Sequence, residues 1–143
     1  MSQLLGNLLG GIIRIYAPEH PAASILTATL SDDLHEFGIL AASILAAGAG
    51  LRVIHLGPNL PTKEVLFAAK RSGANIVLLS LTHVPDWQVR ERELRSLRAG
   101  LPMNVELWLG VNPSSLDVRV DRARVLRDFR ELESSLQRVG GRF

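Results

Sequence analysis

The feature that most constrains the fold is a repeated alternation of short apolar runs with segments of helical periodicity. Strands are predicted at residues 24–30, 51–56, 75–80 and 105–109, with a fifth within 118–126. A turn and a helix-like stretch follow most of these runs. Continuous apolar strands joined by helices are typical of parallel sheets covered on both faces. We therefore predict a doubly wound α/β fold with a five-stranded parallel sheet and right-handed crossovers.

The first residues follow a different pattern. Leucines and isoleucines recur at helical spacing, which predicts an amphipathic helix over residues 2–16 that ends before Pro18. We predict this helix and a linker over residues 1–20, and one compact domain over 21–143.

Composition excludes several classes. With 143 residues, 47% of them apolar and 21% charged, the chain can form a folded core. It has no cysteine, which removes disulfide frameworks, thiolate metal sites and cysteine nucleophiles. The net charge is only +2 and acidic residues are interspersed among the arginines, so direct nucleic-acid binding is not expected. The longest apolar run, residues 37–51, is too short to span a bilayer, and no secretory leader is visible, so we expect a cytoplasmic protein without membrane contact.

A short polar motif follows the first predicted strand. Asp33 stands two residues before His35, and Gly38 three residues after it. One imidazole nitrogen could ligate a metal while the other donates its proton to Asp33, which fixes the tautomer. Gly38 would keep the start of the next helix free of side chains. The alternative is that Asp33 caps the helix and His35 is an ordinary loop residue.

Two other segments are expected near this motif. In a doubly wound sheet, ligands bind beyond the carboxyl ends of the strands, where the strand order reverses. His35 follows the first strand, Ser80 ends the third, and Gly110 follows the fourth. We therefore expect these residues to share one crevice.

The spacing resembles that of the cobalamin-binding domain family, whose Asp-x-His-x-x-Gly motif is followed by Ser-x-Leu and Gly-Gly. Here 41 residues separate Gly38 from Ser80, and 27 separate Thr82 from Gly110. Residues 35–45 and 55–61 look most like the C-terminal domains of MerR-type cobalamin-dependent transcriptional regulators. The resemblance implies a flavodoxin-like, Rossmann-like domain that binds cobalamin with its own base displaced and His35 as the axial cobalt ligand.

The same resemblance implies the remaining contacts. Asp33 would hold His35, and the nucleotide tail of cobalamin would enter a slot beside Ser80 and Gly110. The implied cofactor-binding residues are Asp33, Leu34, His35, Glu36, Phe37, Gly38, Ser80, Leu81, Thr82, Gly110 and Val111. Thr82 stands where the family has Leu, and Val111 where it has a second Gly, so Val111 is expected to narrow the slot. Haem is the alternative cofactor.

Three functions remain open. The first is a cobalamin-binding sensor or transcription-regulatory module, and the second is the small cobalamin-carrying subunit of a mutase or methyltransferase. The third is a haem-binding or cofactor-free interaction domain. The sequence shows no catalytic triad or carboxylate pair of the kind that would let this chain catalyse a reaction alone. A protein partner or self-association is expected to cap the cofactor, because one helix cannot do so.

The other aromatic and basic residues are interpreted structurally. We expect His55 and His83 to be packed or solvated, His20 to lie at the surface, and Trp108 to lie in the core. Trp87 is placed near the rim of the site, and the arginines of residues 85–98 on a solvated helix face.

Overall fold

A computed structural model of the chain describes residues 2–8, 11–82, 84–112 and 118–142. His83 therefore lies outside the described residues. The strands are β1 (Ser2–Leu8), β2 (Gly11–Tyr16), β3 (Ser24–Leu30), β4 (Arg52–Leu60), β5 (Ile76–Leu81), β6 (Glu106–Val111) and β7 (Ala123–Leu126). The helices are α1 (Phe37–Gly48), α2 (Thr62–Ser72), α3 (Trp87–Gly100) and α4 (Phe129–Arg142).

The five predicted strands form the parallel part of one sheet. The strand order is β1-β2-β4-β3-β5-β6-β7, and all pairs from β4 to β7 are parallel. The order reverses at β3, whose neighbours are β4 and β5. This confirms the predicted doubly wound sheet and places its switch point at the end of the strand that precedes His35.

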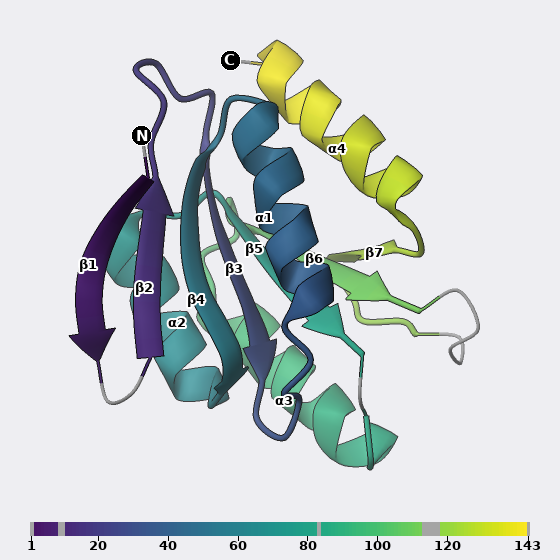
Figure 1. Ribbon diagram of the computed structural model, residues 1–143. Coiled ribbons are helices and arrows are strands. Elements are labelled where there is room, and N and C mark those ends of the chain that lie inside the picture. Colours follow the sequence, from purple (N-terminus) through teal and green to yellow (C-terminus); the bar gives the residue numbers. More distant parts are fainter. Residues whose placement is uncertain (1, 9–10, 83, 113–117, 143) are drawn as a thin grey trace.

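The helices cover the two faces in pairs (Figure 1). Val65 and Ala69 of α2 pack with Leu94 and Leu97 of α3 against one face. On the other face, apolar residues of α1 and α4 surround the sheet residues Ile25, Ile76 and Trp108. Trp108 is 1% exposed, so the predicted core position is confirmed.

The predicted N-terminal helix is wrong. Residues 2–8 and 11–16 instead form two antiparallel strands, β1 and β2, and β2 pairs with β4 through Arg14↔His55 and Tyr16↔Val53. The Gly10-Gly11 pair is a hairpin signal, and the isoleucines that follow it favour a strand. The open edge of β4 supplies hydrogen-bond partners, so tertiary pairing overrides the helical spacing of the leucines. The predicted domain boundary, between residues 20 and 21, falls in the connection from β2 to β3.

The arginines of α3 also differ from the prediction, because they do not all lie on a solvated face. Arg95 is exposed and pairs with Glu91 at 2.6 Å, but Arg90 and Arg98 are 3% and 5% exposed. Arg90 donates a hydrogen bond to the carbonyl of Ser31, 2.9 Å away, in the loop after β3. The aliphatic stems of these arginines are packed in the protein while their guanidinium groups bind backbone carbonyls.

Candidate functional site

Asp33 organises the loop between β3 and α1. Its side chain is 1% exposed, and its Oδ1 accepts hydrogen bonds from the backbone N–H of His35 at 3.1 Å. The same oxygen lies 3.3 Å from His35 Nδ1. Oδ2 accepts from the backbone N–H of Thr82 at 3.0 Å. A buried carboxylate with these donors links the histidine loop to the end of β5.

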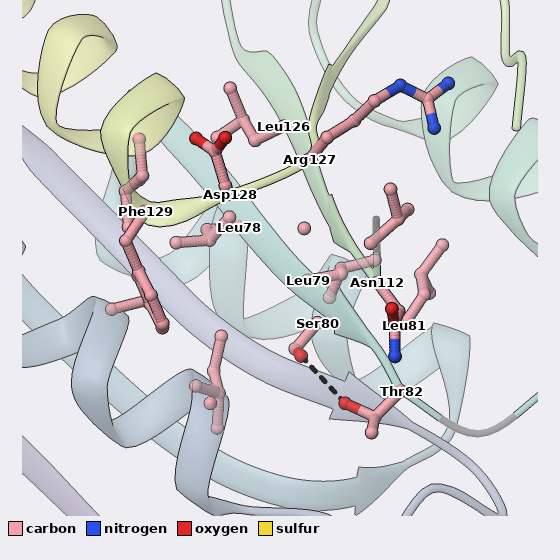
Figure 2. A pocket seen from close by; sticks show the side chains of 16 residues that line it. Leu78, Leu79, Ser80, Leu81, Thr82, Asn112, Leu126, Arg127, Asp128 and Phe129 are labelled. Carbon is pink, nitrogen blue, oxygen red and sulfur yellow. Dashed lines mark hydrogen bonds between the residues drawn. The ribbon is translucent and has the colours of Figure 1, made fainter. Parts of the chain in front are cut away.

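This geometry explains why Thr82 can replace the Leu of the family pattern. Residue 82 contributes its main-chain N–H to Asp33, and every residue type except proline has that donor. The Thr82 hydroxyl in addition lies 3.2 Å from Ser80 Oγ, as Figure 2 shows.

The imidazole of His35 stands at the surface, with 61% of its side chain exposed. Contact with the Asp33 carboxylate favours the tautomer that carries its proton on Nδ1. Nε2 is then the nitrogen with a lone pair suited to a metal. Leu34 and Phe37 on either side are 69% and 85% exposed, which leaves apolar surface around the imidazole.

Three further contacts hold the loop from below. Thr29 donates to the carbonyl of Asp33 at 2.6 Å and accepts from the backbone N–H of Asn59 at 2.8 Å. Asn59 Oδ1 accepts from the backbone N–H of Asp32 at 2.9 Å. Asp32 and Asn59 both have left-handed backbone conformations, with φ of 72° and 62°. Together with Arg90, these contacts fix the backbone that carries His35.

Asn59 was not expected to take part from the sequence. The sequence predicts a strand over residues 51–56 that ends before a turn, but β4 continues to Leu60. Asn tolerates positive φ and carries a side-chain acceptor, so an Asn in a Gly-Pro-Asn segment was the available signal.

A cavity of about 420 Å³ opens beside this loop, at the carboxyl ends of β5, β6 and β7. It lies on the face covered by α1 and α4 (Figure 2). Its lining includes the predicted residues Gly38, Ser80, Leu81, Thr82, Gly110 and Val111. The volume falls in the lower part of the range of small-molecule sites, about 300–1,000 Å³.

Small residues keep the cavity open. Ser80 and Gly110 are register partners on β5 and β6. A Cβ on Gly110 would find only the Leu79 carbonyl oxygen, at 3.7 Å, and a Cβ on Gly38 would lie 3.6 Å from Ser80 Oγ. Larger side chains at positions 38 and 110 would therefore occupy the space between α1 and the sheet.

Val111 lies at the edge of this cavity, but its side chain belongs to the core on the opposite face. It is 8% exposed and packs in the cluster that contains Leu109, Leu81 and Leu97. Because side chains alternate along a strand, positions 108 and 110 lie on the sheet face covered by α1 and α4, while Val111 faces α2 and α3. The side chain of Val111 is therefore directed away from the space between α1 and the sheet.

The wall opposite β5 comes from a segment that sequence reasoning did not select. Leu126, Asp128, Phe129 and Leu132 line the cavity where β7 passes into α4 (Figure 2). Phe129 is 48% exposed. These residue types do not indicate a binding site in the sequence. The packing of α4 beside α1 is what places this segment at the cavity.

His55, expected to be packed or solvated, is buried beneath α1 with 5% exposure. Its Nδ1 lies 2.9 Å from Thr27 Oγ1 and 3.3 Å from Ser43 Oγ. Its Nε2 lies 3.7 Å from Glu36 Oε1, so the predicted site residue Glu36 faces this histidine. Trp87 is half-buried against the α2 and α3 core, and His20 is exposed as expected.

Within the described ranges, no three His, Asp or Glu side chains gather as a multidentate metal site. In the same ranges, no helix is both long and apolar enough to cross a membrane.

Fold and cavity together define a doubly wound α/β domain with a cavity at the carboxyl ends of β5, β6 and β7, next to its topological switch point. No protein-family model and no curated protein matches the chain. Among solved structures, a cobalamin-binding protein from Desulfitobacterium hafniense is 26% identical with a TM-score of 0.56, and the match covers 82% of this chain and 50% of that one.

Two other solved structures share the fold at lower identity. The monomethylamine corrinoid protein of Methanosarcina barkeri is 18% identical with a TM-score of 0.68, covering 82% of this chain and 58% of that one. The methanol:cobalamin methyltransferase complex MtaBC of the same organism is 14% identical with a TM-score of 0.71, covering 87% and 49%. The chain thus spans about half the length of these proteins. The neighbours confirm the predicted resemblance to the cobalamin-binding domain family.

Proposed function

We propose that this chain binds cobalamin, with His35 as the axial ligand to cobalt and the nucleotide tail in the cavity between α1 and α4. One observation carries the proposal: a surface imidazole held by a buried carboxylate lies beside a cavity kept open by Gly38, Ser80 and Gly110. The 26% identical cobalamin-binding protein supports the choice of ligand.

The residues present fit the group. Asp33 sets the tautomer of His35, so that Nε2 would hold the metal. The exposed apolar side chains of Leu34 and Phe37 would meet the corrin ring, and the cavity would shield the tail from water. Bound cobalamin supplies the cobalt–carbon chemistry, while the chain binds and orients it. The Glu36 carboxylate lies 3.7 Å from His55 Nε2, at the start of α1.

For the biological role, we propose a cytoplasmic sensor or regulatory module that transmits the state of cobalamin to a partner. The predicted likeness to MerR-type regulators supports it. A corrinoid-carrying subunit of a methyltransferase is the second candidate, and the fold shared with a corrinoid protein and with a methyltransferase complex favours it. Both roles need a second protein surface, or a second copy of this chain, over the exposed apolar residues around His35.

The test of cofactor binding uses absorption spectra after incubation with hydroxocobalamin and gel filtration. The wild type and the control His20→Ala should retain cobalamin with the same spectrum, because His20 is exposed and outside the site. His35→Ala should lose the spectral signature of imidazole ligation. A colourless wild type, or an unchanged His35→Ala spectrum, would contradict the assignment. A parallel incubation with haem tests the alternative cofactor.

The role is tested by what the loaded protein binds. A sensor should change its self-association, or its binding to a regulatory partner, when cobalamin is added, as measured by light scattering and pull-down. A carrier subunit should keep the same self-association when cobalamin is added, and it should co-purify with a substrate-binding methyltransferase subunit.

A further inference from the structure

A second cleft lies at the opposite end of the sheet from the His35 loop. It measures about 370 Å³ and forms where the amino ends of β6 and β7 meet α3 and the connection that follows it. Three arginines, Arg98, Arg122 and Arg124, line it together with one carboxylate, Glu106. We call this site the arginine cleft. None of its residues lines the cavity proposed for cobalamin.

Arg98 is the buried member of the cleft. It is 5% exposed, and its two Nη atoms donate to the carbonyls of Pro102 at 2.8 Å and Arg122 at 3.4 Å. Its Nε is buried without an acceptor among the described residues. Burial and the positive charge of Arg122 lower the pKa of Arg98. A buried cation without a counter-charge is costly, so this position favours an anion nearby.

The other two arginines are exposed and border the same space. Arg122, immediately before β7, has a left-handed backbone conformation with φ of 59°. The guanidinium carbon of Arg124 lies 5.9 Å from the centroid of the Trp108 ring, which positions its charge by a cation–π contact. Glu106 accepts a hydrogen bond from Trp108 Nε1 at 3.2 Å.

Among the described residues that line the cleft, the positive and negative charges are unequal. In the part of the chain that the structure describes, Arg90 pairs with Glu93 and Arg95 pairs with Glu91, both outside the cleft, while Glu106 accepts from Trp108 Nε1. Three positive charges against one negative charge leave an excess of two around a space large enough for a small molecule. Guanidinium groups bind phosphate and carboxylate oxygens through paired N–H donors.

We propose that the arginine cleft binds a small polyvalent oxyanion, whose phosphate or carboxylate oxygens face Arg98, Arg122 and Arg124. Such a ligand would neutralise the excess charge and give the buried Nε a nearby counter-charge. This site is separate from the cavity proposed for cobalamin, so the proposal does not depend on the cofactor assignment.

The test follows the indole N–H signal of Trp108 by NMR, because this group lies against Glu106 and Arg124. A Trp87→Phe variant assigns the signal. Inorganic phosphate and citrate are titrated at constant ionic strength against chloride. We expect at least one of the two oxyanions to give a saturating shift with a dissociation constant of about 1 mM or below, whereas chloride gives none.

Paired variants locate the site. Arg122→Gln with Arg124→Gln removes the two exposed charges and spares the packed Arg98, and should weaken oxyanion binding at least about tenfold, corresponding to 1.4 kcal/mol. The control, Arg92→Gln with Arg95→Gln, removes two exposed charges on α3 outside the cleft and should change affinity less than about twofold. Saturation by phosphate alone or by citrate alone identifies the ligand chemistry. Shifts that never saturate, or equal losses in both double variants, would overturn the proposal.

Discussion

Replacing Gly110 by alanine should raise stability and lower cobalamin affinity at the same time. Gly110 lies in β6, and an added Cβ would meet only the Leu79 carbonyl oxygen, at an ordinary contact distance of 3.7 Å. Alanine in a strand interior is about 0.5–1 kcal/mol more stable than glycine. For a domain of this size the melting temperature should rise by about 1–4 °C.

The same methyl group enters the cavity proposed for the nucleotide tail. Adding a methyl to a well-filled site typically costs about 1–3 kcal/mol, so affinity should fall about 5- to 150-fold. Both quantities are measurable on one preparation: thermal unfolding of the cofactor-free protein and an absorbance titration with hydroxocobalamin.

Gly48→Ala is the matched control. Gly48 ends α1, and no atom lies within 4 Å of a Cβ built there. It should also raise stability, because alanine is favoured over glycine in a helix, while affinity stays unchanged. If Gly110→Ala keeps wild-type affinity, the tail does not lie beside β6. If it lowers the stability of the cofactor-free protein, the space at Gly110 is not open.

Two other substitutions test how the site is supported. Val111→Ala removes two buried methyl groups from the α2 and α3 core, so it should lower the free energy of unfolding, measured by urea denaturation, by about 2 kcal/mol. Cobalamin affinity should change little. Tighter cobalamin binding by this variant would show that the Val111 side chain reaches the nucleotide tail. Asn59→Ala removes the acceptor for Asp32 and places a Cβ-bearing residue without a side-chain acceptor at φ of 62°, so it should cost about 1–2 kcal/mol and weaken cobalamin binding. Asn59→Gly also lacks the side-chain acceptor but adopts the positive φ without strain. Equal cofactor affinity in Asn59→Gly and wild type would therefore mean that the hydrogen bond to Asp32 does not matter for the site.

The parallel sheet could be predicted because its signals are local. The strands from β3 to β6 are short and mostly apolar, and Gly73 follows α2 in the left-handed conformation typical of a helix C-terminus. The convergence of Asp33, Ser80 and Gly110 at one end of the sheet followed from strand direction alone.

What could not be predicted depends on partners distant in sequence. Leucines at helical spacing cannot indicate that β4 will offer an open edge to β2. Arg90 reads as a surface residue until α3 is packed near Ser31, 59 positions away. The α4 wall of the cavity likewise exists only after the chain has folded. Val111 is different, since the alternation that buries Trp108 already places residue 111 on the opposite face.

The two parts of the proposed site have separate physical supports, and this allows them to be tested separately. The His35 loop is fixed by donors from Thr29 and Thr82 to the Asp33 carbonyl and carboxylate, and by Asn59 Oδ1, which accepts from the Asp32 N–H. The cavity depends on side-chain size at Gly110. His35→Ala should therefore change the axial spectrum while the cavity still holds the tail, and Gly110→Ala should weaken binding while the spectrum of the bound cofactor stays that of the wild type. Because different interactions are removed, the two free-energy losses should add in the double variant; a double variant no weaker than His35→Ala alone would show that the tail enters the cavity only after His35 has bound the metal.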